Sequence, residues 1–109
     1  MITYDDFAKL DIRIGTIESA EKMPNADKLL KLQVNFGEEK RQILSGTAEF
    51  YSPESLVGKQ CPFLINLEPR KIKGEESQGM LLAIDPSGDK KDCVIMHPEK
   101  KVDNGTRVV

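Results

Sequence analysis

Three cations lie close together in the segment of residues 66–80, and they are the side chains of this chain best suited to bind an anion. Arg70, Lys71 and Lys73 fall within four residues, and Gly74 follows them directly. Arg can hold a phosphate through two parallel hydrogen bonds, whereas Lys acts as a point charge. The segment therefore predicts a contact with phosphate groups. A solvated basic turn stays an open alternative, because three glutamates of the same segment partly cancel the field.

Two neutral side chains border the cations and suit the uncharged parts of a ligand. Asn66 precedes them and Ser77 follows them. Both can form hydrogen bonds with sugar or base edges, while the cations fix a phosphate backbone.

The distribution of charge points to the same part of the chain. The net charge of −2 argues against a general polyanion binder, but residues 28–74 carry eight Lys/Arg against five Asp/Glu, and both flanks are acidic. We therefore expect an anionic partner to meet the middle of the chain. An ordinary solvated surface is the alternative explanation of this imbalance.

Catalytic and metal-binding patterns are not found. Cys61 and Cys93 lack C-x-x-C spacing, and the single histidine, His97, precedes a proline. We expect reduced thiols, no metal, no cofactor and no enzymatic activity. Four Phe, two Tyr and no Trp also argue against a stacking platform for single strands, so a folded RNA is the better partner.

The positions of strands and helices follow from apolar periodicity and turn residues. Thr3 and two aspartates predict a short N-terminal helix, whose Phe7 and Leu10 must pack on the body of the domain or on a partner. Ser52 and Pro53 predict a second short helix that ends at Gly58. Apolar alternation predicts strands at 12–17, 30–34, 41–45, 60–66 and 80–84, with further candidates at 93–96 and 106–109, and a bulge or bend near Gly15.

Five main strands with a short helix between the third and the fourth predict an all-β fold, a five-stranded Greek-key barrel of the oligonucleotide/oligosaccharide-binding (OB) type. Such barrels bind ligands over strands two and three and over two loops. We place these loops at residues 19–28 and 67–79. We expect residues 1–109 to form a single domain, located in the cytoplasm and without a membrane segment.

The chain resembles a known family along nearly its whole length: the tRNA-binding domain shared by methionyl-tRNA synthetase C-terminal or beta-subunit segments, free-standing bacterial tRNA-binding proteins and the endothelial monocyte-activating polypeptide group. The resemblance rests on several ordered motifs. They are Phe7–Gly15, Pro24–Leu29, Ser45-Gly46, Tyr51–Gly58, Asn66–Lys71, Ser77–Ala83 and Gly105–Arg107.

The resemblance implies an OB fold, binding of tRNA with little sequence preference, association with an aminoacyl-tRNA synthetase, and a homodimer. It implies a tRNA-binding face formed by Asn66, Ser77 and Met80 with Arg70, Lys71 and Lys73, to which Lys28 and Lys31 are added. The Ser77-Gln78-Gly79-Met80 sequence favours the tRNA-binding branch over chaperone-like paralogues. The N-terminal helix and residues 93–102 are the family's interface candidates.

Three other functions stay open. A chaperone-like dimer would bind polypeptide through exposed apolar residues, and such binding would survive high salt. An assembly module would dock a separate synthetase chain and touch tRNA only weakly. An enzyme would require turnover that depends on His97 or on a carboxylate.

Overall fold

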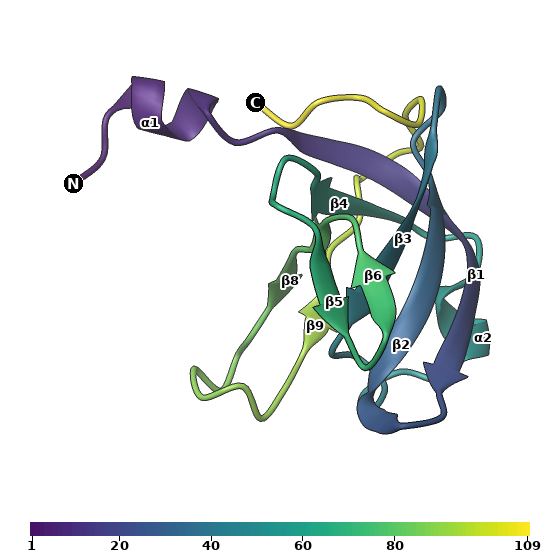
Figure 1. Ribbon diagram of the computed structural model, residues 1–109. Coiled ribbons are helices and arrows are strands. Elements are labelled where there is room, and N and C mark those ends of the chain that lie inside the picture. Colours follow the sequence, from purple (N-terminus) through teal and green to yellow (C-terminus); the bar gives the residue numbers. More distant parts are fainter.

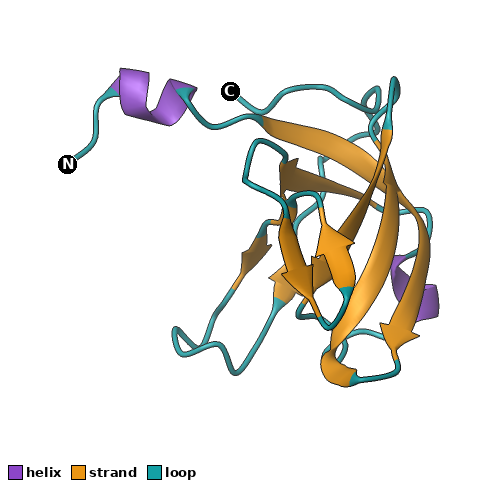
Figure 2. Cartoon of the chain, viewed as in Figure 1, coloured by secondary structure: helices purple, strands orange, loops and turns teal.

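Alternating apolar residues build a strongly curved five-stranded sheet, and the computed structural model describes all residues, 1–109 (Figure 1). Strands dominate, and the two helices are short and peripheral (Figure 2). The elements in chain order are α1 (Tyr4–Ala8), β1 (Ile12–Met23), β2 (Ala26–Asn35), β3 (Lys40–Ser45), α2 (Pro53–Leu56), β4 (Gln60–Leu64), β5 (Arg70–Ile72), β6 (Glu75–Ser77), β7 (Met80–Leu81), β8 (Ala83–Ile84) and β9 (Val94–Ile95).

The long strand β1 serves both halves of the sheet. Its first part pairs with β4 and its second part with β2, and the register shifts between Ile17 and Ser19. Position 15 has no room for a side chain, because a Cβ there would lie 2.6 Å from Cγ1 of the buried Val34. An irregularity was predicted near Gly15, but the pairing of Gly15 with Cys61 is regular and the register shift lies between Ile17 and Ser19.

The sheet order is β3-β2-β1-β4-β7. Pro62 lies in the middle of β4, which is an inner strand of this sheet. Its partner in β1 is Ile14. The backbone N–H and C=O of Ile14 bond to Thr106 and Gly105 of the C-terminal segment, so this pair needs no donor from the proline.

The barrel closes where β3 meets residues 76–79. The backbone N–H of Gln78 donates to the carbonyl of Gln42 at 2.8 Å, and the side chains of Ser77 and Gln78 complete the seam. The helix α2 lies between β3 and β4 and places the fully buried Leu56 in the core. The predicted OB-type barrel is confirmed.

One apolar cluster fills the barrel. Phe63 is fully buried and meets Phe36 edge to face, with ring centroids 5.4 Å apart. Fully buried aliphatic residues from three strands surround this pair, namely Ile17, Leu30, Leu32, Val34 and Ile43. Removing the Phe63 ring would cost about 3–5 kcal/mol, because a closed core cannot collapse into the cavity.

The prediction that residues 19–28 and 67–79 form loops is wrong, because both segments contain strands. Residues 19–28 are mostly strand, since β1 runs to Met23 and β2 begins at Ala26. Residues 67–79 contain the hairpin of β5 and β6. The strand residues of both segments are mostly polar and lack a clear apolar alternation, so the sequence predicted loops.

Smaller boundaries also differ from the predictions. The strand predicted at 60–66 ends at Leu64, and the strand predicted at 80–84 is divided into β7 and β8. The candidate at 93–96 is confirmed as β9, whereas 106–109 forms only an isolated bridge between Arg107 and Arg13.

The N-terminal helix lies apart from the barrel (Figure 1). Thr3 caps it as predicted, since its Oγ1 accepts from the N–H of Asp6 at 3.2 Å and the Asp6 carboxylate accepts from the N–H of Thr3. No residue of α1 is buried. At α2, Pro53 opens the helix as predicted, but the Ser52 side chain makes no capping hydrogen bond.

Candidate nucleic-acid interface

The β5–β6 hairpin carries the three cations that the sequence singled out. Its two-residue turn is Lys73-Gly74, with φ of 54° and 84°. Positive φ at both central residues is the geometry of a type I′ turn, which matches the twist of the flanking strands. The cations are therefore held on a twisted two-stranded ribbon and not on an irregular loop. The ribbon lies in front of β2 and β3 (Figure 1).

The hairpin cations are free of carboxylate partners. Arg70, Lys71 and Lys73 are exposed, and none lies within 4.0 Å of a carboxylate oxygen. Seven other basic residues do have such partners: Lys9, Arg13, Lys31, Lys40, Arg41, Lys91 and Arg107. Unpaired cations keep their full charge for an external anion.

The two predicted lysines of β2 differ from each other. Lys28 is exposed and unpaired, whereas Lys31 lies between Glu21 at 3.1 Å and Glu75 at 3.4 Å. The hydrogen bond that the Lys31 ammonium donates to the Glu21 carboxylate is the main cause that raises the pKa of Lys31. The structure therefore places Lys28 as a free cation and Lys31 as a neutralised one.

Asn66 joins the end of β4 to the segment that follows α1. Its Oδ1 accepts from the N–H of Asp11 at 2.9 Å, and its Nδ2 donates to the carbonyl of Lys9 at 2.7 Å. The side chain is exposed at the surface, but its amide is already engaged on both atoms.

Ser77 lies inside the seam of the barrel, and Met80 lies at the surface beside it. The Ser77 hydroxyl accepts from the N–H of Leu44 and donates to the carbonyl of Gly79, both at 3.0 Å. Ser77 is 2% exposed, whereas Met80, paired with Leu64, is 40% exposed. The eight predicted residues thus comprise four exposed, unpaired cations, the paired Lys31, the exposed apolar Met80, and two polar residues, Asn66 and Ser77, whose hydrogen bonds lie within the protein.

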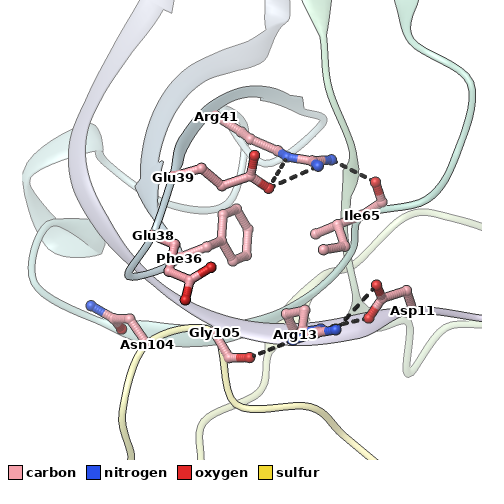
Figure 3. Close-up of a pocket in the computed structure, with 9 residues that line it drawn as sticks. All are labelled: Asp11, Arg13, Phe36, Glu38, Glu39, Arg41, Ile65, Asn104 and Gly105. Carbon is pink, nitrogen blue, oxygen red and sulfur yellow. Dashed lines mark hydrogen bonds and ion pairs between the residues drawn. The ribbon is translucent and has the colours of Figure 1, made fainter.

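A polar cleft of about 570 Å³ at the end of the barrel was not anticipated from the sequence (Figure 3). Two guanidinium groups line it. Arg13 donates to Asp11 at 2.6 Å and to the carbonyl of Gly105, while Arg41 donates to Glu39 and to the carbonyl of Ile65. The Arg13 side chain is also the main cause that lowers the pKa of Asp11.

This cleft is a poor site for an anion. Its lining contributes three carboxylates against the two guanidinium groups, and both guanidinium groups are engaged within the protein. The lining comes from separate segments at residues 11–13, 36–41, 65 and 104–105, so the cleft exists only once the fold brings these segments together.

The structure also brings Cys61 next to His97, with Sγ 3.9 Å from Nδ1. This contact lacks the properties of a nucleophile and its base. Nδ1 of His97 donates to the carbonyl of Gln60 at 2.8 Å, so it has no lone pair for the thiol. Burial raises the pKa of Cys61 to about 11, which keeps the sulfur protonated at neutral pH.

No group of three His, Cys, Asp or Glu side chains is arranged to hold a metal ion. No helix has the length and apolar character needed to cross a membrane.

Comparison with known proteins gives concordant matches. Residues 12–107 match the family model described as "Putative tRNA binding domain". The methionine–tRNA ligase of Methanococcoides burtonii is 52% identical over 107 residues, which cover 97% of this chain and 15% of the ligase. The chain thus spans less than a sixth of the length of that relative.

Two solved structures match over the full length of the chain. A protein from Pyrococcus horikoshii described as related to MetRS has a TM-score of 0.93 and 38% identity, and 98% of it is covered. The chaperone CsaA from Bacillus anthracis has a TM-score of 0.90 and 32% identity, and 99% of it is covered.

Proposed function

The chain belongs to the tRNA-binding domain family, and from this premise we propose that it binds tRNA without catalysing a reaction, through the β5–β6 hairpin and the adjoining surface. The observation that carries the proposal is the set of unpaired, exposed cations Arg70, Lys71 and Lys73 on one twisted ribbon. Cations of this kind bind phosphates and thereby fix the position of a nucleic acid, with little dependence on its sequence.

The other predicted residues take different parts in this proposal. Lys28 adds a cation, and Met80 offers an apolar contact beside the hairpin. Asn66 and Ser77 contribute through the hydrogen bonds that fix the two ends of the hairpin segment, and Lys31 contributes through Glu75. Folded RNA is recognised by its shape and its backbone, which suits a rigid, preformed ribbon.

The proposed biological role is recruitment of tRNA for a synthetase of the methionine type. It is supported by the identity of 52% with a methionine–tRNA ligase. A bound or fused tRNA-binding domain makes the encounter of tRNA with the catalytic body effectively intramolecular, which raises apparent affinity without new contacts in the active site.

We also propose a homodimer in which α1 of each copy packs on the partner. A five-residue helix is too short to be stable without tertiary contacts. Yet Tyr4 of α1 is 77% exposed and Leu10, which follows the helix, is 40% exposed, so these contacts are missing within the chain. An apolar groove of about 420 Å³ could receive a second copy's helix. Its lining includes Ile12, Ile14, Pro62, Leu82, Met96 and Val102.

A salt titration of tRNA affinity tests the main proposal. The variant is Arg70→Ala/Lys71→Ala/Lys73→Ala, and an unstructured RNA of equal length serves as the ligand control. A matched protein control is Lys59→Ala/Lys100→Ala/Lys101→Ala, which removes three cations that are likewise unpaired but lie elsewhere.

The proposal expects the hairpin variant to lose about two to three units of the log-log salt slope, and the control variant to lose clearly less. Wild-type protein should prefer folded tRNA to the unstructured RNA. Equal slopes for wild type and hairpin variant would show that the hairpin is only a solvated turn.

A chaperone-like function is the second candidate, favoured by the similarity to CsaA and by the exposed apolar side chains of the N-terminal segment, Ile2, Tyr4 and Leu10. It predicts binding of unfolded polypeptide that persists at salt concentrations at which tRNA dissociates.

A further inference from the structure

The hairpin is attached to the barrel mainly through side chains. Between β3 and residues 76–79 there is a single backbone–backbone hydrogen bond, from Gln78 to Gln42. A regular strand pair would supply two such bonds for every second residue. The remaining polar contacts across this seam use side chains, so the attachment depends on a few specific residues.

Gln42 is the centre of this attachment. Its backbone N–H donates to Oε1 of Gln78 at 3.1 Å, and its carbonyl accepts from the N–H of Gln78. Its side-chain Nε2 donates to the carbonyl of Glu76 at 2.9 Å, while its Oε1 accepts from Nε2 of Gln33 at 3.1 Å. One residue of β3 therefore binds β2 on one side and β6 on the other.

A second tie runs from β2 to the far end of β6. Lys31 lies 3.4 Å from Glu75, next to the turn that carries Lys73. Together the two ties hold both ends of β6, and β5, with Arg70 and Lys71, is held only through its pairing with β6 and through the half-buried Ile72.

We propose that Gln42 is a positioning residue for tRNA binding, one that fixes the orientation of the hairpin cations without contacting the RNA itself. The inference rests on the proposed role of the hairpin. Phosphates along an RNA helix are regularly spaced, so a hairpin with a fixed orientation can bring its cations to several phosphates at once. A loosened hairpin must first be ordered on binding, and this loss of conformational entropy lowers the affinity.

The test compares Gln42→Met with Gln33→Met. Both changes remove an amide of the same size from neighbouring positions on the same face, but only the first removes a bond to the hairpin. Hydrogen exchange of amides 70–77 should accelerate in Gln42→Met, while the amides of β1 and β2 keep their protection. Gln33→Met should leave the hairpin amides nearly unchanged.

Affinity for tRNA should fall about fivefold to tenfold in Gln42→Met, the range expected for the loss of one or two ordinary hydrogen bonds. Introduced into the Arg70→Ala/Lys71→Ala/Lys73→Ala background, Gln42→Met should have no further effect, because its action passes through those cations. Additive losses would overturn the inference, and so would equal losses in the two Met variants.

The two proposals fail in distinguishable ways. If the triple alanine variant binds tRNA as tightly as wild type, then the hairpin is not the binding site and both proposals fall. If the triple variant loses affinity but Gln42→Met does not, only the positioning role of Gln42 is wrong.

Discussion

At the scale of single residues, the polar groups of the site divide into those available for a ligand and those used by the fold. Arg70, Lys71 and Lys73 have no partner of opposite charge, while Ser77 and Asn66 have used their hydrogen-bonding groups within the protein. The sequence motifs of the proposed binding surface therefore include residues such as Asn66 and Ser77, whose side chains hold the protein backbone in place.

Ser77→Ala should destabilise the barrel. The substitution leaves the buried N–H of Leu44 and the carbonyl of Gly79 without their partner, and such an unsatisfied group costs about 1–3 kcal/mol. Urea unfolding measures the loss. Ser55→Ala is the control, because that hydroxyl is exposed and donates only to the carbonyl of Ser52, just before α2, and its effect should stay within about 0.5 kcal/mol. Equal stability of wild type and Ser77→Ala would contradict the role of the seam.

The thiol of Cys61 predicts a pH dependence of stability. Burial raises its pKa from 9.0 to about 11, so the unfolded chain releases this proton at a lower pH than the folded chain does. The contribution of the neutral thiol is complete below pH 9 and is lost as pH rises from 9 towards 11. Denaturant midpoints of wild type should fall more steeply across this window than those of Cys61→Ala. Parallel curves would show that the thiol is not protected.

At the scale of elements, the β5–β6 hairpin places one of the proposed binding cations, Lys73, at a turn position that most residues adopt only at a cost in free energy. Lys73 occupies a left-handed conformation that ordinary residues adopt at a cost of roughly 1–2 kcal/mol and that Asn tolerates better. A cation in this place adds a third positive charge to those of Arg70 and Lys71 on the same hairpin. This turn position therefore holds a charged residue, Lys73, although Asn would suit its backbone conformation better.

Lys73→Asn should separate these two properties. The Asn-Gly turn is the preferred type I′ sequence, so we expect slower hydrogen exchange in the hairpin together with weaker tRNA binding and a salt slope smaller by about one unit. Lys71→Asn serves as the control, since it removes a cation from a strand position without improving the turn. Faster exchange in Lys73→Asn would show that the lysine stabilises the turn.

At the scale of the whole molecule, the apolar surface at the N-terminus is the main feature that the barrel leaves uncovered. The helix α1 buries no residue, and the C-terminal segment is tied beside it through Arg107, which donates to the carbonyls of Ala8 and Leu10. A second copy would supply the cover that the chain itself lacks, and it would present a second hairpin to tRNA.

Phe7→Asp/Leu10→Asp should convert a dimer into a monomer. Light scattering should give about twice 12.2 kDa for the wild-type chain and a single mass for the variant, because charged groups cannot be buried in an apolar contact. Val57→Asp changes an apolar residue that is 48% exposed, close to the 40% of Leu10, but lies far from the N-terminal segment in the sequence, and it should keep the wild-type mass. A wild-type chain of single mass at high concentration would remove the dimer from the proposal.

The sequence by itself determined those features that depend on neighbouring residues. Alternation along β2 and β3 predicted strands, Thr3 predicted a capped helix, and the spacing of Arg70, Lys71 and Lys73 predicted the basic segment. Each of these depends on side-chain periodicity or on a backbone bond within a few residues, so the pattern can be read locally.

Only the tertiary structure decided how the basic segment is held. Leu44 meets Ser77 across 33 positions and Lys31 meets Glu75 across 44, and both contacts exist because the barrel closes between β3 and residues 76–79. A strand sequence specifies which face is buried but not which edge will be paired. For this reason the attachment of the hairpin to β3, the neutralised Lys31 and the buried Ser77 hydroxyl had no local signal.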